Sequence, residues 1–242
     1  MARYWGTRNY SQPTNAELQK NAEETRSKAN RKGIVYDPVV VEGRSICHSW
    51  WGNAWCENLE RYADYASRID RGKRYVRNGS VVDLQITRGK VTARVQGTRK
   101  TPYKVEIRIS PLSEEKCQAI MEKCGKKLSS LETLLDGSFP EDMKDVFFEE
   151  NALFPSPAEI SLNCSCPDWA LMCKHVAAAL YGIGTRFDRD PMLFFELRGI
   201  DVERFIDVTL QDKVDEMLSM VDNRTSRMMD DDIDLSAIFG SL

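Results

Sequence analysis

Three cysteines and one histidine fall within twelve residues of this 242-residue chain, and they constrain its fold more than any other feature. They are Cys164, Cys166, Cys173 and His175, arranged as a C-x-C arm and a C-x-H arm separated by six residues. Three thiolates and one imidazole complete the tetrahedral ligand set of a structural zinc ion. Buried free cysteines are common, but four ligands this close together rarely arise by chance. The sequence therefore predicts a zinc site with no open position for a catalytic water.

The segments on either side of the cluster indicate what the ion would join. Residues 159–163 have the character of a short strand. Val176, Leu180 and Ile183 follow helical spacing and predict a helix that begins near Lys174. Thiolates close to a helix N-terminus are favoured by its partial positive charge. We therefore expect the zinc ion to fasten the end of a strand to the start of a helix.

Elsewhere the periodicity predicts a second, antiparallel element and several helices. Apolar and polar residues alternate over residues 81–109, interrupted by turns, which is typical of a three-stranded meander. Apolar spacing predicts helices over residues 49–66, 113–128, 129–137, 140–147, 191–197 and 202–208, and a short strand over 39–41. Three tryptophans, Trp50, Trp51 and Trp55, fit the core better than a base-stacking surface. The predicted fold class is α+β: a small antiparallel sheet with flanking helices, plus a zinc-stapled strand–helix finger.

Composition shifts divide the chain into five predicted regions. They are a polar N-terminal arm (1–35), a basic α+β region with the meander (36–112), a helical connector (113–158), the zinc finger with the following helices (159–210), and an acidic C-terminal tail (211–242). The arm fits either a solvated helix or a loose segment. We expect the basic sheet and the finger to unfold as separate units.

Charge is distributed unevenly along the chain. Residues 1–110 carry 21 lysines and arginines against 11 acidic residues, whereas residues 111–242 carry 13 against 26. From Arg68 to Arg108 there are twelve basic and three acidic residues, which is typical of a surface that meets a phosphate backbone. The predicted nucleic-acid contacts are Arg71, Lys73, Arg74, Arg77, Arg88, Lys90, Arg94, Arg99, Lys100, Lys104 and Arg108. A solvated face, or docking onto an acidic protein surface such as this chain's own second half, remains the alternative.

No set of residues predicts a reaction centre. The chain lacks the G-x-x-x-x-G-K-[ST] loop of nucleotide-driven motors. His48 with Cys47 or Cys56 resembles a base and nucleophile only in composition, and Asp230–Asp234 lies in a segment too polar to hold carboxylates rigidly. We therefore expect a protein that is not an enzyme and has no small-molecule substrate. Without an 18-residue apolar run or a leader pattern, we expect a cytoplasmic protein that does not contact membranes.

The C-x-C and C-x-H arms, followed by a helix of small residues, resemble the SWIM zinc finger. Further segments are similar to prokaryotic SWIM zinc finger family proteins over roughly residues 36–207. They are residues 49–55, 71–75, 95–97, 102–103, 167–168, 190–191 and 197–199. The resemblance implies zinc binding, interaction with nucleic acid or protein, and association with Snf-type helicase-like ATPases.

These observations predict a zinc-binding, non-enzymatic accessory protein that binds nucleic acid, DNA more than RNA, beside a helicase-like ATPase. The alternative is a protein–protein interaction adaptor, in which the finger and the acidic tail contact a partner protein. Salt dependence separates the two, because binding to phosphates releases counterions.

Overall fold

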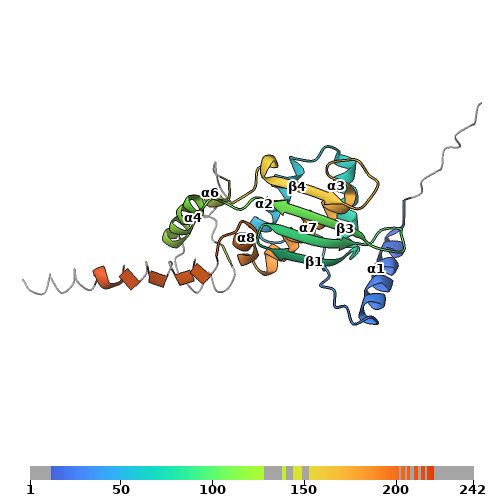
Figure 1. Ribbon diagram of the computed structural model, residues 1–242, viewed down its shortest axis with the longest axis horizontal. Coiled ribbons are helices and arrows are strands. Elements are labelled where there is room, and N and C mark those ends of the chain that lie inside the picture. The colour runs from blue at the N-terminus through green and yellow to red at the C-terminus, as the bar shows by residue number, and fades with distance from the viewer. Residues whose placement is uncertain are drawn as a thin grey trace, which may run out of the picture.

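A four-stranded antiparallel sheet, in the order β1-β2-β3-β4, is the centre of the computed structural model (Figure 1). The strands are β1 (Val81–Thr87), β2 (Lys90–Val95), β3 (Tyr103–Ile109) and β4 (Ile160–Cys164). The structure describes residues 12–127, 138–139, 144–148, 153–201, 203–204, 206–207, 210–211, 214–215 and 217–220. The α+β fold class predicted from the sequence is confirmed.

The predicted meander forms β1 to β3, and the predicted finger strand joins it as β4. β4 lies antiparallel to β3, with Cys164 opposite Val105 and Ile160 opposite Ile109. The ranges assigned to a basic region and to a finger therefore share one sheet. They also share one hydrophobic core, which contains residues from both. The expectation that the sheet and the finger form separate folding units does not match this arrangement, because β4 has its hydrogen-bond partners in the meander.

Helix α7 (Lys174–Arg189) packs across the inner face of the sheet and contacts all four strands. Every residue from His175 through Thr185 is buried, so this stretch of the helix exposes almost no surface to solvent. Helices α2 (Trp50–Glu60) and α3 (Ala66–Arg77) pack on α7. Trp55 is fully buried, and its indole N–H donates to the Leu180 carbonyl over 3.0 Å. The prediction that the tryptophans belong to the core is confirmed for Trp51 and Trp55, and Trp50 is half-buried against the core.

Three local predictions differ from the structure. The helix predicted over residues 49–66 ends at Glu60, and a separate helix, α3, follows it. Helix α3 was missed because its apolar positions are few and arginines and lysines fill most of the others. Residues 39–41 do not form a strand, although the Val39 N–H donates to the Val81 carbonyl beside β1 over 3.0 Å.

Helix α1 (Asn15–Asn30) fits the helical alternative for the N-terminal arm. Thr14 and Glu17 form a reciprocal capping box, which satisfies backbone donors of the first turn. The helix buries Leu18, Ala22, Thr25 and Ala29, and it contacts β1. The Thr25 hydroxyl also donates to the Gln96 side chain over 2.8 Å. The helix therefore packs on the sheet and is not solvated on all sides.

The remaining described elements lie at one end of the sheet. They are α4 (Glu114–Lys127), α6 (Lys144–Phe148), a 3₁₀ turn η2 (Pro157–Glu159) and α8 (Met192–Leu197), and every described position between 203 and 220 is helical. The predicted helix over 129–137, the cluster Asp230–Asp234 and most of the acidic tail lie outside the described residues. In the part of the chain that the structure describes, no helix combines the length and the apolar character needed to cross a bilayer.

Candidate metal centre

The four predicted zinc ligands come together where β4 ends and α7 begins. Cys164 is the last residue of β4, Cys173 is the N-cap of α7, and His175 lies in its first turn. The three sulfurs and one imidazole nitrogen all lie within 4.8 Å of one another. His175 Nδ1 is 3.9 Å from the Cys164 sulfur and 4.0 Å from the Cys173 sulfur. The two ligand arms therefore bring the end of β4 beside the start of α7, as the sequence predicts.

This donor set fits Zn²⁺ in both chemistry and size. Zinc–sulfur bonds of about 2.3 Å and zinc–nitrogen bonds of about 2.0–2.1 Å place tetrahedral ligand atoms about 3.6–3.8 Å apart. The distances of 3.9 and 4.0 Å from His175 are only slightly wider. Cys173 and His175 are buried, and Cys164 and Cys166 are half-buried. Such a site is a closed structural one, because protein atoms supply all four ligands.

Aromatic packing fixes the orientation of the His175 ring. The ring stacks on Tyr103, with centroids 4.0 Å apart and planes 24° apart, and the edge of Tyr75 lies at 5.6 Å. His175 Nε2 is buried and has no hydrogen-bond partner among the described residues. A Cβ atom at Gly97 would lie 3.4 Å from this nitrogen and 2.9 Å from the Tyr103 ring. Because Gly97 has no Cβ, the imidazole has room to lie with Nδ1 toward the sulfurs.

The electrostatics of the cluster favour the metal-binding form of Cys173 and His175 and the protonated form of Cys164 and Cys166. A hydrogen bond with the Cys164 thiol lowers the pKa of Cys173 to about 4. Burial lowers the pKa of His175, which keeps its imidazole neutral. The pKa of Cys164 is raised, first by its hydrogen bond with Cys173, and burial raises the pKa of Cys166. Zinc would displace the protons that these two thiols retain.

The loop between the two ligand arms, residues 167–172, is held by two carboxylates. The Asp64 side chain accepts the backbone N–H of Leu171 over 3.0 Å and that of Met172 over 3.4 Å. Asp168 forms an ion pair with Arg68 of α3 at 3.0 Å. The loop nevertheless leaves the Trp169 side chain 82% exposed. Sequence reasoning missed Trp169, although a large aromatic residue in a six-residue zinc-binding loop was the signal that could have identified it.

The eleven cations predicted to contact nucleic acid do not share one surface. Lys90, Arg94, Lys104 and Arg108 lie on the sheet face opposite α7; Arg71, Lys73, Arg74 and Arg77 lie on α3; Arg88, Arg99 and Lys100 lie in connections between strands. Helix α3 packs on α7, which lies behind the sheet, so the two larger groups are separated by the core. A single basic patch over residues 68–108 is therefore not formed.

Several of these cations also have partners within the chain. On the sheet face, Arg94 pairs with Asp83 at 3.3 Å, and Glu106 pairs with both Lys90 and Arg108 at 2.8 Å. On α3, Lys73 pairs with Glu60 at 2.8 Å, and Arg74 hydrogen-bonds to Asn15 and Gln12. These contacts reduce the positive charge available to a ligand without cancelling it.

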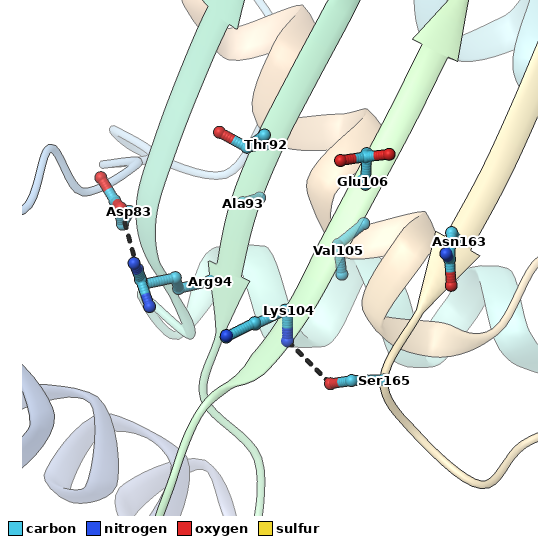
Figure 2. Close-up of a pocket in the computed structure, with 9 residues that line it drawn as sticks. All are labelled: Asp83, Thr92, Ala93, Arg94, Lys104, Val105, Glu106, Asn163 and Ser165. Atoms are coloured by element: carbon cyan, nitrogen blue, oxygen red, sulfur yellow. Dashed lines mark hydrogen bonds and ion pairs between the residues drawn. The ribbon is translucent and has the colours of Figure 1, made fainter.

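The outer face of the sheet is polar and hollowed (Figure 2). A hollow of ≈ 460 Å³ is lined by Asp83, Thr92, Ala93, Arg94, Lys104, Val105, Glu106, Asn163 and Ser165. Figure 2 shows the Arg94 and Lys104 side chains on this face, with a helix behind the strands. The Lys104 N–H donates to the Ser165 hydroxyl over 2.9 Å. The hollow extends from Asp83 on β1 to Ser165, between the first two zinc ligands.

The residues considered for catalysis are occupied in other contacts. The His48 ring lies 3.1 Å from the Glu42 carbonyl, and its backbone N–H donates to Asp188 over 2.6 Å. The Cys47 and Cys56 sulfurs lie 3.6 Å apart and are both buried. The His48 ring therefore contacts a backbone carbonyl, and the two thiols contact each other.

Comparison with known proteins identifies the finger. The family model of the SWIM zinc finger matches residues 146–182. Uncharacterized protein Rv2102 of Mycobacterium tuberculosis (strain ATCC 25618 / H37Rv) is 38% identical over 161 residues, which are 66% of this chain and 58% of that protein. No solved structure matches the chain. The chain therefore contains a SWIM zinc finger, whose cluster of three cysteines and one histidine binds zinc, and it is a homologue of a mycobacterial protein of which it spans 58%.

Proposed function

We propose that this zinc-binding SWIM protein is a non-enzymatic accessory factor that binds nucleic acid on the outer face of its sheet. The observation that carries the proposal is the composition of this face. Four cations, Lys90, Arg94, Lys104 and Arg108, stand on it against two acidic residues, Asp83 and Glu106.

The register of the strands arranges these groups in rows. Asp83, Arg94 and Lys104 lie side by side on neighbouring strands, and Thr87, Lys90 and Arg108 form a second row at the opposite end. The side chains of such a row project from one face, about 4.8 Å apart between strands. Each row places two cations on neighbouring strands, and such a pair of donors suits the oxygens of a phosphate backbone, which accept hydrogen bonds from lysine and arginine.

The zinc ion supports this surface without taking part in chemistry. All four of its positions are filled by protein ligands, so it offers no site for an activated water. We assign the protein to the cytoplasm, where thiolate ligands stay reduced. We also propose DNA, more than RNA, as the ligand. From the family resemblance, we propose a Snf-type helicase-like ATPase as the protein partner.

The salt dependence of binding tests the proposal. We expect the affinity of the purified chain for labelled DNA to fall steeply with salt, with a log–log slope of about −0.9 per neutralised phosphate on duplex or about −0.7 on single strands. Lys104→Gln should flatten the slope by about one such increment. Lys116→Gln, an exposed lysine on α4, is the matched control and should leave the slope unchanged.

Two outcomes would contradict the proposal. If no DNA or RNA bound at low salt, the adaptor alternative, in which the finger contacts a partner protein, would replace it. If Arg71→Gln and Arg77→Gln on α3 flattened the slope while Lys104→Gln did not, the nucleic acid would bind behind the sheet, and the outer face would not be the site.

A further inference from the structure

The zinc-binding loop and the N-cap of α3 each display an aromatic side chain that the fold does not bury. Trp169 is 82% exposed and Tyr65 is 44% exposed. Their rings meet edge to face, with centroids 6.0 Å apart and planes 88° apart. A tryptophan carries a large apolar surface that is normally buried, as it is for Trp55 in α2. An exposed pair of rings, one on the loop and one at the start of α3, is the arrangement expected of a binding surface.

Contacts along the loop hold Trp169 in a defined position before any ligand arrives. Zinc ligands bound the loop on both sides, at Cys166 and Cys173. Between them, the Asp64 carboxylate accepts the Leu171 N–H over 3.0 Å, and Asp168 pairs with Arg68 at 3.0 Å. A ligand that contacts Trp169 would therefore lose little affinity to ordering of the backbone.

Exposed cations lie at the end of the sheet where β4 leads into the zinc-binding loop. Ser165, which lies between the zinc ligands Cys164 and Cys166, exchanges two hydrogen bonds of 2.9 Å with the backbone of Lys104. Arg99 and Lys100 belong to the connection that leads into β3, at this same end. All three cations are exposed, and none forms an ion pair with any residue that the structure describes. The guanidinium of Arg99 lies over the Tyr103 ring at 5.1 Å, which still leaves its charge uncompensated.

We propose that the zinc-binding loop and this end of the sheet form a site for single-stranded nucleic acid. Trp169 stacks on an unpaired base, and Arg99, Lys100 and Lys104 contact the adjoining phosphates. The inference rests on the proposed function and deepens it by specifying the strand state of the ligand.

The combination of free rings and unpaired cations distinguishes this ligand from others. In a duplex, both faces of each base are covered by its neighbours, whereas an unpaired base offers a face to an aromatic side chain. An apolar protein segment would bury Trp169 but would leave the three cations without a partner. A polynucleotide strand satisfies both, because bases and phosphates alternate along it.

Fluorescence anisotropy with three labelled probes of equal length provides the test: oligothymidylate, oligouridylate and a mixed-sequence DNA duplex. Trp169→Ala should weaken binding to the single strands by about 5- to 150-fold, the loss of one stacked base, and should change duplex binding much less. The ratio of the two single-strand affinities shows whether the site prefers DNA or RNA.

Three further variants separate stacking from simple apolar contact. Trp169→Phe keeps an aromatic ring and should retain most of the affinity, whereas Trp169→Leu should lose as much as alanine does. Leu171→Ala is the matched control, since Leu171 is 66% exposed on the same loop and has no ring. If Trp169→Leu bound like the parent while Leu171→Ala lost affinity, the loop would be an apolar docking surface for protein, and the stacking proposal would be wrong.

The result also separates this inference from the proposed function. If Trp169→Ala bound single strands like the parent while Lys104→Gln reduced the salt dependence, the sheet face would bind nucleic acid without the loop, and only this inference would fail. If the parent chain bound none of the probes, both would fail. The zinc content of each variant should remain near one per chain, which shows that the loop is intact.

Discussion

At the scale of single residues, the buried cation Arg198 joins three segments at the end of the sheet that lies away from the zinc site. Its guanidinium donates to the Ser110 carbonyl over 2.7 Å and to the Glu159 carboxylate over 2.8 Å, and its side chain is 1% exposed. Burial is the largest single influence and acts to raise the pKa of Glu159, but the hydrogen bonds with Arg198 and Ser156 and the charge of Arg198 together outweigh it, so the pKa is lowered overall. The pair therefore stabilises the folded chain while Glu159 is ionised.

Glu159→Gln tests this contribution. It leaves Arg198 with a neutral partner, and we expect the free energy of unfolding to fall by about 2 kcal/mol at neutral pH. Urea unfolding at fixed zinc concentration measures it. Glu57→Gln, at an exposed position of α2, is the control and should change stability by less than about 0.5 kcal/mol.

The pH dependence of the same variant gives an independent check. Because the folded pKa of Glu159 is lowered, its stabilisation is complete above the unfolded pKa of about 4.3 and is lost as the pH falls through the folded value. The stability difference between parent and Glu159→Gln should therefore be constant from pH 6 to 8, and it should shrink below about pH 4. A difference that persisted in acid would show that the carboxylate charge is not its source.

At the scale of secondary-structure elements, the crossing of α3 and α7 depends on one glycine. A Cβ atom at Gly72 would lie 2.5 Å from the Cβ of Ala177 and 3.1 Å from the α7 backbone. Glycine within a helix normally costs about 0.5–1 kcal/mol relative to alanine. The tight crossing is the reason that this cost is tolerated here.

Gly72→Ala should therefore destabilise the chain by about 1–3 kcal/mol, although alanine favours helix formation. Ser67→Ala, on the exposed side of α3, should be neutral or slightly stabilising. Combining Gly72→Ala with Ala177→Gly removes the nearest contact, so the double variant should be more stable than the sum of the single changes predicts. Additive changes in thermal unfolding would show that the two helices do not meet at these residues.

Elements with a clear period could be predicted from the sequence, and elements defined by long-range pairing could not. The alternation over residues 81–109 predicted β1 to β3, and Ser49 and Lys174 marked the starts of α2 and α7 correctly. Nothing local shows that β4, more than fifty residues beyond β3, adds to its edge. For the same reason, charge counting along the chain did not reveal that the core separates the cations of α3 from those of the sheet.

The candidate site also has one part that the sequence predicts and another that depends on long-range contacts. The four zinc ligands are close in sequence, so their spacing was sufficient to predict the cluster that the structure brings together. The exposure of Trp169 depends on Asp64, which holds the loop from a distant part of the chain, and no sequence pattern reports it.

At the scale of the whole molecule, the zinc site fastens the edge strand of the sheet to its central helix. Because α7 contacts all four strands, loss of the metal should destabilise the sheet as well as the finger. Structural zinc contributes on the order of 10 kcal/mol in small fingers, comparable with the stability of a whole domain. We expect His175→Ala to abolish hydrogen-exchange protection in residues 81–109 together with residues 160–189. Protection retained in β1 to β3 alone would show that the meander is an independent folding unit.

The metal content of the purified chain tests the central claim, that one zinc ion bound by Cys164, Cys166, Cys173 and His175 holds this fold together. For protein prepared without added zinc, elemental analysis should give one zinc per chain, and the zinc should resist dialysis. Cysteine-alkylating reagents should leave Cys164 and Cys166 unmodified until a chelator removes the metal, because a coordinated thiolate is a poor nucleophile. A zinc content near zero, with Cys164 and Cys166 freely alkylated in folded protein, would contradict the claim.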